Sequence, residues 1–71
     1  MLDYTLQIKV GKQIKKLREL KGISQQVLAA KCNFEKGNMS RLESGRVNPT
    51  LATLEKVCKA LEVNISELFN F

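Results

Sequence analysis

The sequence contains no histidine and no tryptophan, and Asp3 is its only aspartate. Because histidine is the side chain that ordinarily titrates near neutral pH, the groups left for chemistry are carboxylates, lysines and two thiols. These residues do not assemble into a paired-carboxylate, metal-ligand or nucleophile-and-base arrangement, and 71 residues are too few for a sizeable catalytic cleft. We therefore expect no enzymatic activity, no metal site and no cofactor.

Cysteine is also scarce. Cys32 and Cys58 lie far apart and show no CxxC spacing, whereas zinc sites and redox pairs use closely spaced thiols or neighbouring histidines. Each cysteine stands among apolar residues at helical spacing, so we expect both in the core. A redox-sensing thiol is the alternative for either residue.

Long apolar runs are absent as well. No stretch is long enough to span a bilayer, and no charged segment followed by an apolar stretch leads to a cleavage site. We expect a cytoplasmic protein without a membrane partner, and no feature of the sequence indicates a small-molecule ligand. A hydrophobic content of 44% suffices for one compact core, which predicts a single domain over residues 1–71.

Lysine and arginine outnumber the acidic residues, which gives the chain a net charge of +5. Ten of the 12 basic residues lie within residues 1–46, opposed there by four acidic residues, whereas residues 47–71 carry a small negative excess. A positive field of this kind favours a polyanionic partner. Composition alone does not separate nucleic acid from an acidic membrane or protein surface.

Turn-forming residues divide the chain into five segments of helical spacing, which predicts an all-α fold of five helices. These residues are Gly22, Asn33, Gly45, the Asn48–Pro49 pair and Asn64. Ser24 is suited to cap the second helix, expected over residues 25–32, and Thr50 to cap the fourth. The third helix is expected over residues 36–44, and Asn64 with Glu67 forms a capping box for a short fifth helix.

The first eight residues are ambiguous, because apolar and polar residues alternate from there to Val10 in a two-residue period. The apolar members are Leu2, Tyr4, Leu6, Ile8 and Val10. A strand that pairs across a dimer axis would bury them, as would an N-terminal arm folded back on its own domain or a lengthened first helix.

Residues 25–45 carry the most demanding pattern in the chain. Leu28, Ala29 and Cys32 precede the turn residue Asn33, and Phe34, Met39 and Leu42 follow it. Two short helices that meet at a steep angle need a small residue where their backbones approach, a turn residue able to take positive φ, and apolar anchors on both inner faces. This segment supplies all three, which predicts a helix-turn-helix.

With these motifs the sequence resembles the Cro and phage-repressor (XRE-type) helix-turn-helix family over residues 10–69. The matching stretches are Val10-Gly11 through Leu17-Arg18, Gly22-Ile23-Ser24-Gln25, Leu28-Ala29, Met39-Ser40-Arg41-Leu42-Glu43-Ser44-Gly45, Asn48-Pro49-Thr50-Leu51, Lys59-Ala60-Leu61 and Leu68-Phe69. The resemblance implies a five-helix, lambda-repressor-like DNA-binding domain. Its third helix is expected to enter the major groove, with the second helix lying across the mouth of the groove.

The resemblance also assigns the base-contacting positions to Lys36, Gly37 and Arg41, with Asn38 and Ser40 nearby. Lys36 and Arg41 can each donate to guanine O6 and N7, and the planar fork of Arg41 matches both acceptors better. Contact with phosphates alone is the alternative for both. Gly37 departs from the family, which commonly has a polar side chain there. Either specificity is weaker at that base pair, or a thymine methyl packs against the helix.

Four further positions match residues that the family uses on the DNA backbone: Gln25, Ser44, Arg46 and Asn48. Gln25 lies at the start of the second helix, and the other three lie at the end of the third helix and in the loop that follows it. Arg18 and Glu43 match a structural ion pair that the family forms between its first and third helices, and such a pair chiefly fixes geometry.

The sequence thus predicts a transcriptional regulator that binds double-stranded DNA sequence-specifically, as a homodimer on a palindromic operator. The dimer interface is expected either in the alternating N-terminal residues or in the C-terminal residues Leu68, Phe69 and Phe71. The alternative for both sets is that they cap the core of the monomer itself. The alternative function is an antitoxin or adaptor-type protein-interaction module with secondary DNA binding. Binding to duplex DNA that weakens as salt rises would favour the first function.

Overall fold

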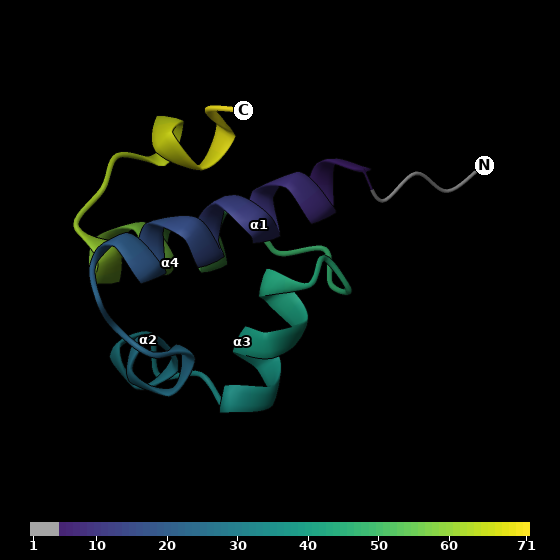
Figure 1. The fold of residues 1–71 in the computed structure, drawn as a ribbon. Helices are drawn as coiled ribbons and strands as arrows, with labels where there is room; N and C mark the ends of the chain where they lie inside the picture. The colour runs from purple at the N-terminus through teal and green to yellow at the C-terminus, as the bar shows by residue number, and fades with distance from the viewer. Residues whose placement is uncertain (1–4) are drawn as a thin grey trace.

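The computed structural model describes residues 5–71, and over these residues the fold is all-helical with no strand (Figure 1). The elements are α1 (Thr5–Leu20), α2 (Gln25–Lys31), α3 (Lys36–Glu43), α4 (Leu51–Leu61) and a C-terminal 3₁₀ helix, η1 (Ile65–Phe69). The predicted all-α class is confirmed. The predicted count of five α-helices is wrong, because the described residues form four α-helices and η1.

The fifth element is a 3₁₀ helix because it is only five residues long, and short segments close more readily with i→i+3 bonds. The predicted capping residues still mark its start, since the backbone amide of Asn64 donates to a carboxylate oxygen of Glu67 at 3.0 Å. Leu68 anchors η1 in the core with no exposed surface.

The alternating N-terminal pattern does not form a strand from Thr5 onward. Helix α1 begins there, so of the three alternatives the lengthened first helix describes residues 5–10; Leu2 and Tyr4 lie outside the described residues. The first turns of α1 are held against the loop after α3. A Cβ added at Gly45 would lie 2.7 Å from the Cα of Ile8, so only glycine permits this approach.

The predicted caps and turns are confirmed. Ser24 and Thr50 each accept a hydrogen bond at 3.1 Å from the backbone amide three residues further on. Gly22, Asn33 and Gly45 adopt positive φ angles of 71°, 58° and 77°, a region that glycine enters freely and asparagine more easily than most residues. The chain therefore ends α1, α2 and α3 where these residues stand.

One core joins all five elements, and both cysteines belong to it as predicted. Its fully buried side chains include Ile14 of α1, Leu28 of α2, Met39 of α3, Val57 and Leu61 of α4, and Leu68 of η1. Burial raises the pKa of the Cys32 and Cys58 thiols above the ordinary value. Both thiols are free and behave as small apolar core groups.

Helix α1 lies between α2 and α3 on one side and η1 on the other (Figure 1). It approaches the end of α3 closely, because a Cβ added at Gly11 would lie 2.5 Å from the backbone oxygen of Glu43. The outer face of α3 is thus directed away from the C-terminal helix. Among residues 5–71, none of the helices combines the length and the apolar character needed to cross a membrane.

Candidate nucleic-acid interface

Helix α3 has one face in the core and one face in solvent. Met39 and Leu42 are buried, whereas all five predicted base-contacting residues are exposed: Lys36, Gly37, Asn38, Ser40 and Arg41. The apolar side chains fix the helix to the rest of the fold. The exposed face is cationic and carries hydrogen-bonding groups. Its position relative to the core is fixed by the two buried side chains.

Arg41 and Asn38 are bonded to each other on this face. The Arg41 Nη2 group donates to the side-chain oxygen of Asn38, one turn earlier in α3. A Cβ added at Gly37 would lie 3.5 Å from Arg41 Nη1, and apart from its chain neighbours and the backbone of its own helix it would meet no other atom within 4 Å. The guanidinium therefore extends along the helix beside Gly37, and the missing side chain leaves this surface open.

A buried ion pair lies beneath the exposed face, between the two residues that the family resemblance pairs. Arg18 Nε lies 2.7 Å from Glu43 Oε2, and Arg18 Nη2 lies 3.2 Å from Glu43 Oε1. The third nitrogen, Nη1, donates to the Ile23 carbonyl at 2.9 Å. The Glu43 side chain is only 3% exposed. The pKa of Arg18 is raised, chiefly by its hydrogen bond to Glu43.

Gln25 extends this network to the first residue of α2. Its Nε2 group donates to Glu43 Oε1 at 3.0 Å, a partner that the sequence motif did not indicate. The Glu43 carboxylate thus accepts hydrogen bonds from α1 and from α2. Three helices are tied together at this single carboxylate, which fixes the start of α2 against the end of α3.

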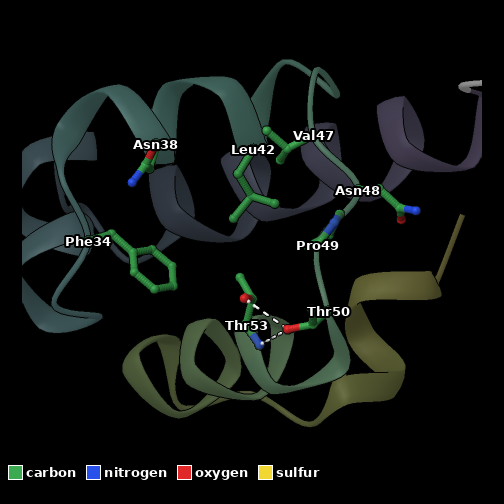
Figure 2. Close-up of a pocket in the computed structure, with 8 residues that line it drawn as sticks. All are labelled: Phe34, Asn38, Leu42, Val47, Asn48, Pro49, Thr50 and Thr53. Atoms are coloured by element: carbon green, nitrogen blue, oxygen red, sulfur yellow. Dashed lines mark hydrogen bonds between the residues drawn. The ribbon is translucent and has the colours of Figure 1, made fainter.

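The loop after α3 contains the other three predicted backbone contacts. Ser44 donates its hydroxyl to the Arg41 carbonyl at 3.1 Å, and Arg46 and Asn48 are exposed. Asn48 also lines a hollow of about 260 Å³ between α3 and the start of α4, together with Phe34, Leu42, Val47 and Pro49. Figure 2 shows the Asn48 side chain projecting away from Phe34 and Leu42. It is therefore available at the surface.

A second hollow, of about 220 Å³, is lined only by polar and charged residues. Lys15, Gln25, Ser40, Glu43 and Ser44 line it, so that it lies where α1, α2 and α3 meet. Sequence reasoning missed Lys15, because the family resemblance assigns it no role and only the packing of α1 against α3 brings it here. Ser40 was grouped with the base-contacting positions, and the structure shows that it also faces this hollow.

Comparisons with known proteins show similarity to helix-turn-helix regulators. A family model described as a Cro/C1-type helix-turn-helix DNA-binding domain matches residues 13–71. The control protein C.MunI of Mycoplasma sp is 36% identical over 66 residues, which are 92% of this chain and 89% of that protein. The immunity repressor of Bacillus phage phi105 is 37% identical over 83% of this chain, which spans 41% of that repressor.

Solved structures agree with these relatives. The restriction-modification controller protein C.AhdI from Aeromonas hydrophila superposes with a TM-score of 0.89 at 32% sequence identity. The match covers 93% of this chain and 96% of that one. A TM-score this high over nearly the whole chain means that the helix order and the packing of α2 against α3 are shared.

Proposed function

Because this chain belongs to the Cro/C1-type helix-turn-helix family of DNA-binding transcriptional regulators, we propose that it binds a palindromic operator as a homodimer. The observation that carries this proposal is the exposed, cationic face of α3, anchored by the buried Met39 and Leu42. One recognition helix contacts only a few base pairs, so selective binding needs a second copy related by two-fold symmetry. We place this activity in the cytoplasm, without a cofactor or a catalytic step.

Within the interface we assign Arg41 to a guanine. Its guanidinium is exposed, and its hydrogen bond to Asn38 limits its freedom before DNA arrives. The second N–H of Nη2 remains, together with an N–H of Nη1 or of Nε, to donate to guanine O6 and N7. Lys36, at the first position of α3, is proposed to contact a neighbouring base or phosphate as a mobile point charge.

The DNA backbone is assigned to residues on both sides of α3. Gln25 is fixed by Glu43 at the start of α2, and Ser44, Arg46 and Asn48 follow the end of α3. Such contacts set the register of the helix in the groove and carry no sequence information of their own. Arg46 is expected to contribute most to affinity because it alone of these four is charged.

The dimer interface is proposed on the apolar surface that joins α4 to η1. Leu51 is 77% exposed, and with Ile65 and Phe69 it lines a hollow of about 530 Å³. An adjoining hollow adds Leu6 to Leu51 and Phe69. Contiguous apolar surface of this kind marks an association site in a soluble protein. Leu68 takes no part, because it is fully buried in the chain's own core.

Leu51→Ser tests this interface, with Leu20→Ser as the matched control. Leu20 is 73% exposed but lies at the end of α1, outside both hollows. Symmetry removes two leucines at once, each worth about 1.5–3 kcal/mol when buried. Sedimentation equilibrium should therefore show a dimer weakened about 100-fold or more by Leu51→Ser and unaffected by Leu20→Ser. Equal behaviour of the two variants would place the interface elsewhere.

Titration of duplex DNA over a range of salt concentrations tests binding itself. Phosphate contacts release counterions, so affinity should fall linearly on a log–log plot as salt rises. If binding is absent at low salt, or does not weaken with salt, the DNA-binding proposal fails. That outcome would favour the antitoxin or adaptor alternative.

The relatives also suggest which promoters are controlled. C.AhdI and C.MunI, which this chain spans over 96% and 89% of their lengths, are named as a restriction-modification controller and a control protein. We propose that this chain controls a restriction-modification promoter. Specific binding to DNA upstream of a neighbouring endonuclease or methyltransferase gene would support this, and its absence there would refute it.

A further inference from the structure

The polar hollow at the junction of α1, α2 and α3 has the composition of an anion site. Its cation is Lys15, which comes from α1 and is exposed. The Ser44 hydroxyl already donates to the Arg41 carbonyl. Gln25 contributes an amide and Ser40 contributes a hydroxyl, so that with Lys15 three helices present hydrogen-bond donors to one small volume. Phosphate oxygens accept hydrogen bonds from all of these groups.

The acidic residue in the hollow does not cancel this charge. Glu43 is almost fully buried, and its two oxygens already accept hydrogen bonds from Arg18 and Gln25. Its negative charge is balanced by the guanidinium of Arg18 on the side away from solvent. Among the described residues Lys15 forms no salt bridge, so the charge that faces solvent at this point is positive.

The hollow lies beside the proposed base-contacting surface. Successive residues of an α-helix point about 100° apart, so Ser40 is turned away from its neighbour Arg41. Ser40 and Ser44 are four residues apart and lie on one row of α3, which faces α2 and the hollow. When α3 lies in the major groove, the residues of this row are directed toward a strand of the DNA backbone.

We propose that Lys15 binds one backbone phosphate of the operator in each half-site, with Gln25 and Ser40 as hydrogen-bond donors to the same group. This inference rests on the proposed function and deepens it in two ways. It adds a residue of α1 to the DNA interface. It also assigns Ser40 to a contact with the DNA backbone instead of a contact with a base.

Lys15→Gln tests the site, and Lys16→Gln is its matched control. Lys16 is the next residue of α1, is also exposed and does not line the hollow. Loss of one phosphate contact should reduce the slope of log affinity against log salt by about 0.9 for each copy of the chain. We expect that reduction, with equal losses on specific and non-specific duplexes, for Lys15→Gln only.

A neutral methylphosphonate placed at successive positions of the operator locates the phosphate. The wild-type protein should lose affinity at each contacted phosphate, and at one of these positions in each half-site Lys15→Gln should lose markedly less than the wild-type protein. Equal salt slopes for the two lysine variants, or an unchanged methylphosphonate penalty in Lys15→Gln, would overturn this inference alone. Failure of the wild-type protein to bind any duplex would overturn the proposed function with it. Circular dichroism should show both variants folded, since both side chains are exposed.

Discussion

Removal of Arg18 is the perturbation whose effect the structure predicts most sharply. Arg18→Met keeps most of the length of the side chain and removes the charge and all the donors. The Glu43 carboxylate, 3% exposed, would keep only its hydrogen bond from Gln25, and the Ile23 carbonyl would lose its bond from Nη1. A buried negative charge would then remain without a counterion.

Breaking a buried pair from one side costs about 3–5 kcal/mol. Domains are stable by about 0.05–0.15 kcal/mol per residue, which is roughly 4–11 kcal/mol for a chain of this length. The variant should therefore lose about a quarter or more of its stability. At about 4–8 °C per kcal/mol for a domain of this size, the melting temperature should fall by about 12–40 °C.

Urea unfolding followed by circular dichroism measures this loss of stability. The double variant Arg18→Met/Glu43→Leu tests whether the loss comes from the unpaired buried carboxylate. Replacing both members of a buried pair by apolar groups is often close to neutral. The double variant should therefore be more stable than Arg18→Met. If Arg18→Met costs less than about 1 kcal/mol, or if the double variant is no more stable than the single one, the carboxylate is not desolvated as described.

Two further predictions concern glycines and thiols. Gly11→Ala should cost about 1–3 kcal/mol in thermal unfolding because its Cβ meets the Glu43 backbone. Gly37→Ala should add up to about 1 kcal/mol, because its Cβ would meet only the end of the Arg41 side chain at an ordinary contact distance of 3.5 Å. Equal effects of the two would contradict the packing of α1 on α3. Since burial raises the pKa of the Cys32 and Cys58 thiols above 9.0, stability should be full below pH 9.0 and decrease above it. As pH rises above 9.0, the urea midpoint should decrease less in the Cys32→Ala/Cys58→Ala variant than in the wild-type protein. An identical decrease in the two proteins would show that ionisation of these thiols is not the cause.

Local chemistry predicted most of the fold. Ser24 and Thr50 satisfy free amides at helix starts, and Asn33 and Gly45 tolerate positive φ, so each acts through its own neighbours and is visible in the sequence. Glu62 was not predicted, although it too adopts a positive φ of 59° at the end of α4. There Val63 bonds to the Cys58 carbonyl at 3.0 Å and packs on the core, so tertiary contacts override local preference.

The sequence also predicted part of the site, namely the residues whose exposure follows from local helical periodicity. Residues on the outer row of α3, such as Arg41, follow from helical periodicity once the buried Met39 is identified. The role of Gln25 as a ligand of Glu43 and the position of Lys15 depend on how α1 packs against α2 and α3. No short-range pattern specifies that packing, because it is set by close approaches such as Gly11 against the end of α3.

Selection of bound sequences from a random duplex pool tests most directly whether the exposed face of α3 determines sequence as part of a symmetric dimer. The wild-type protein should enrich an inverted repeat with a guanine at the Arg41 position of each half. Arg41→Ala should enrich it with reduced stringency at that base, and Arg46→Ala should weaken all sequences alike. An Arg41→Ala protein that selects the same motif with equal stringency, or a wild-type protein that selects none, would contradict the account.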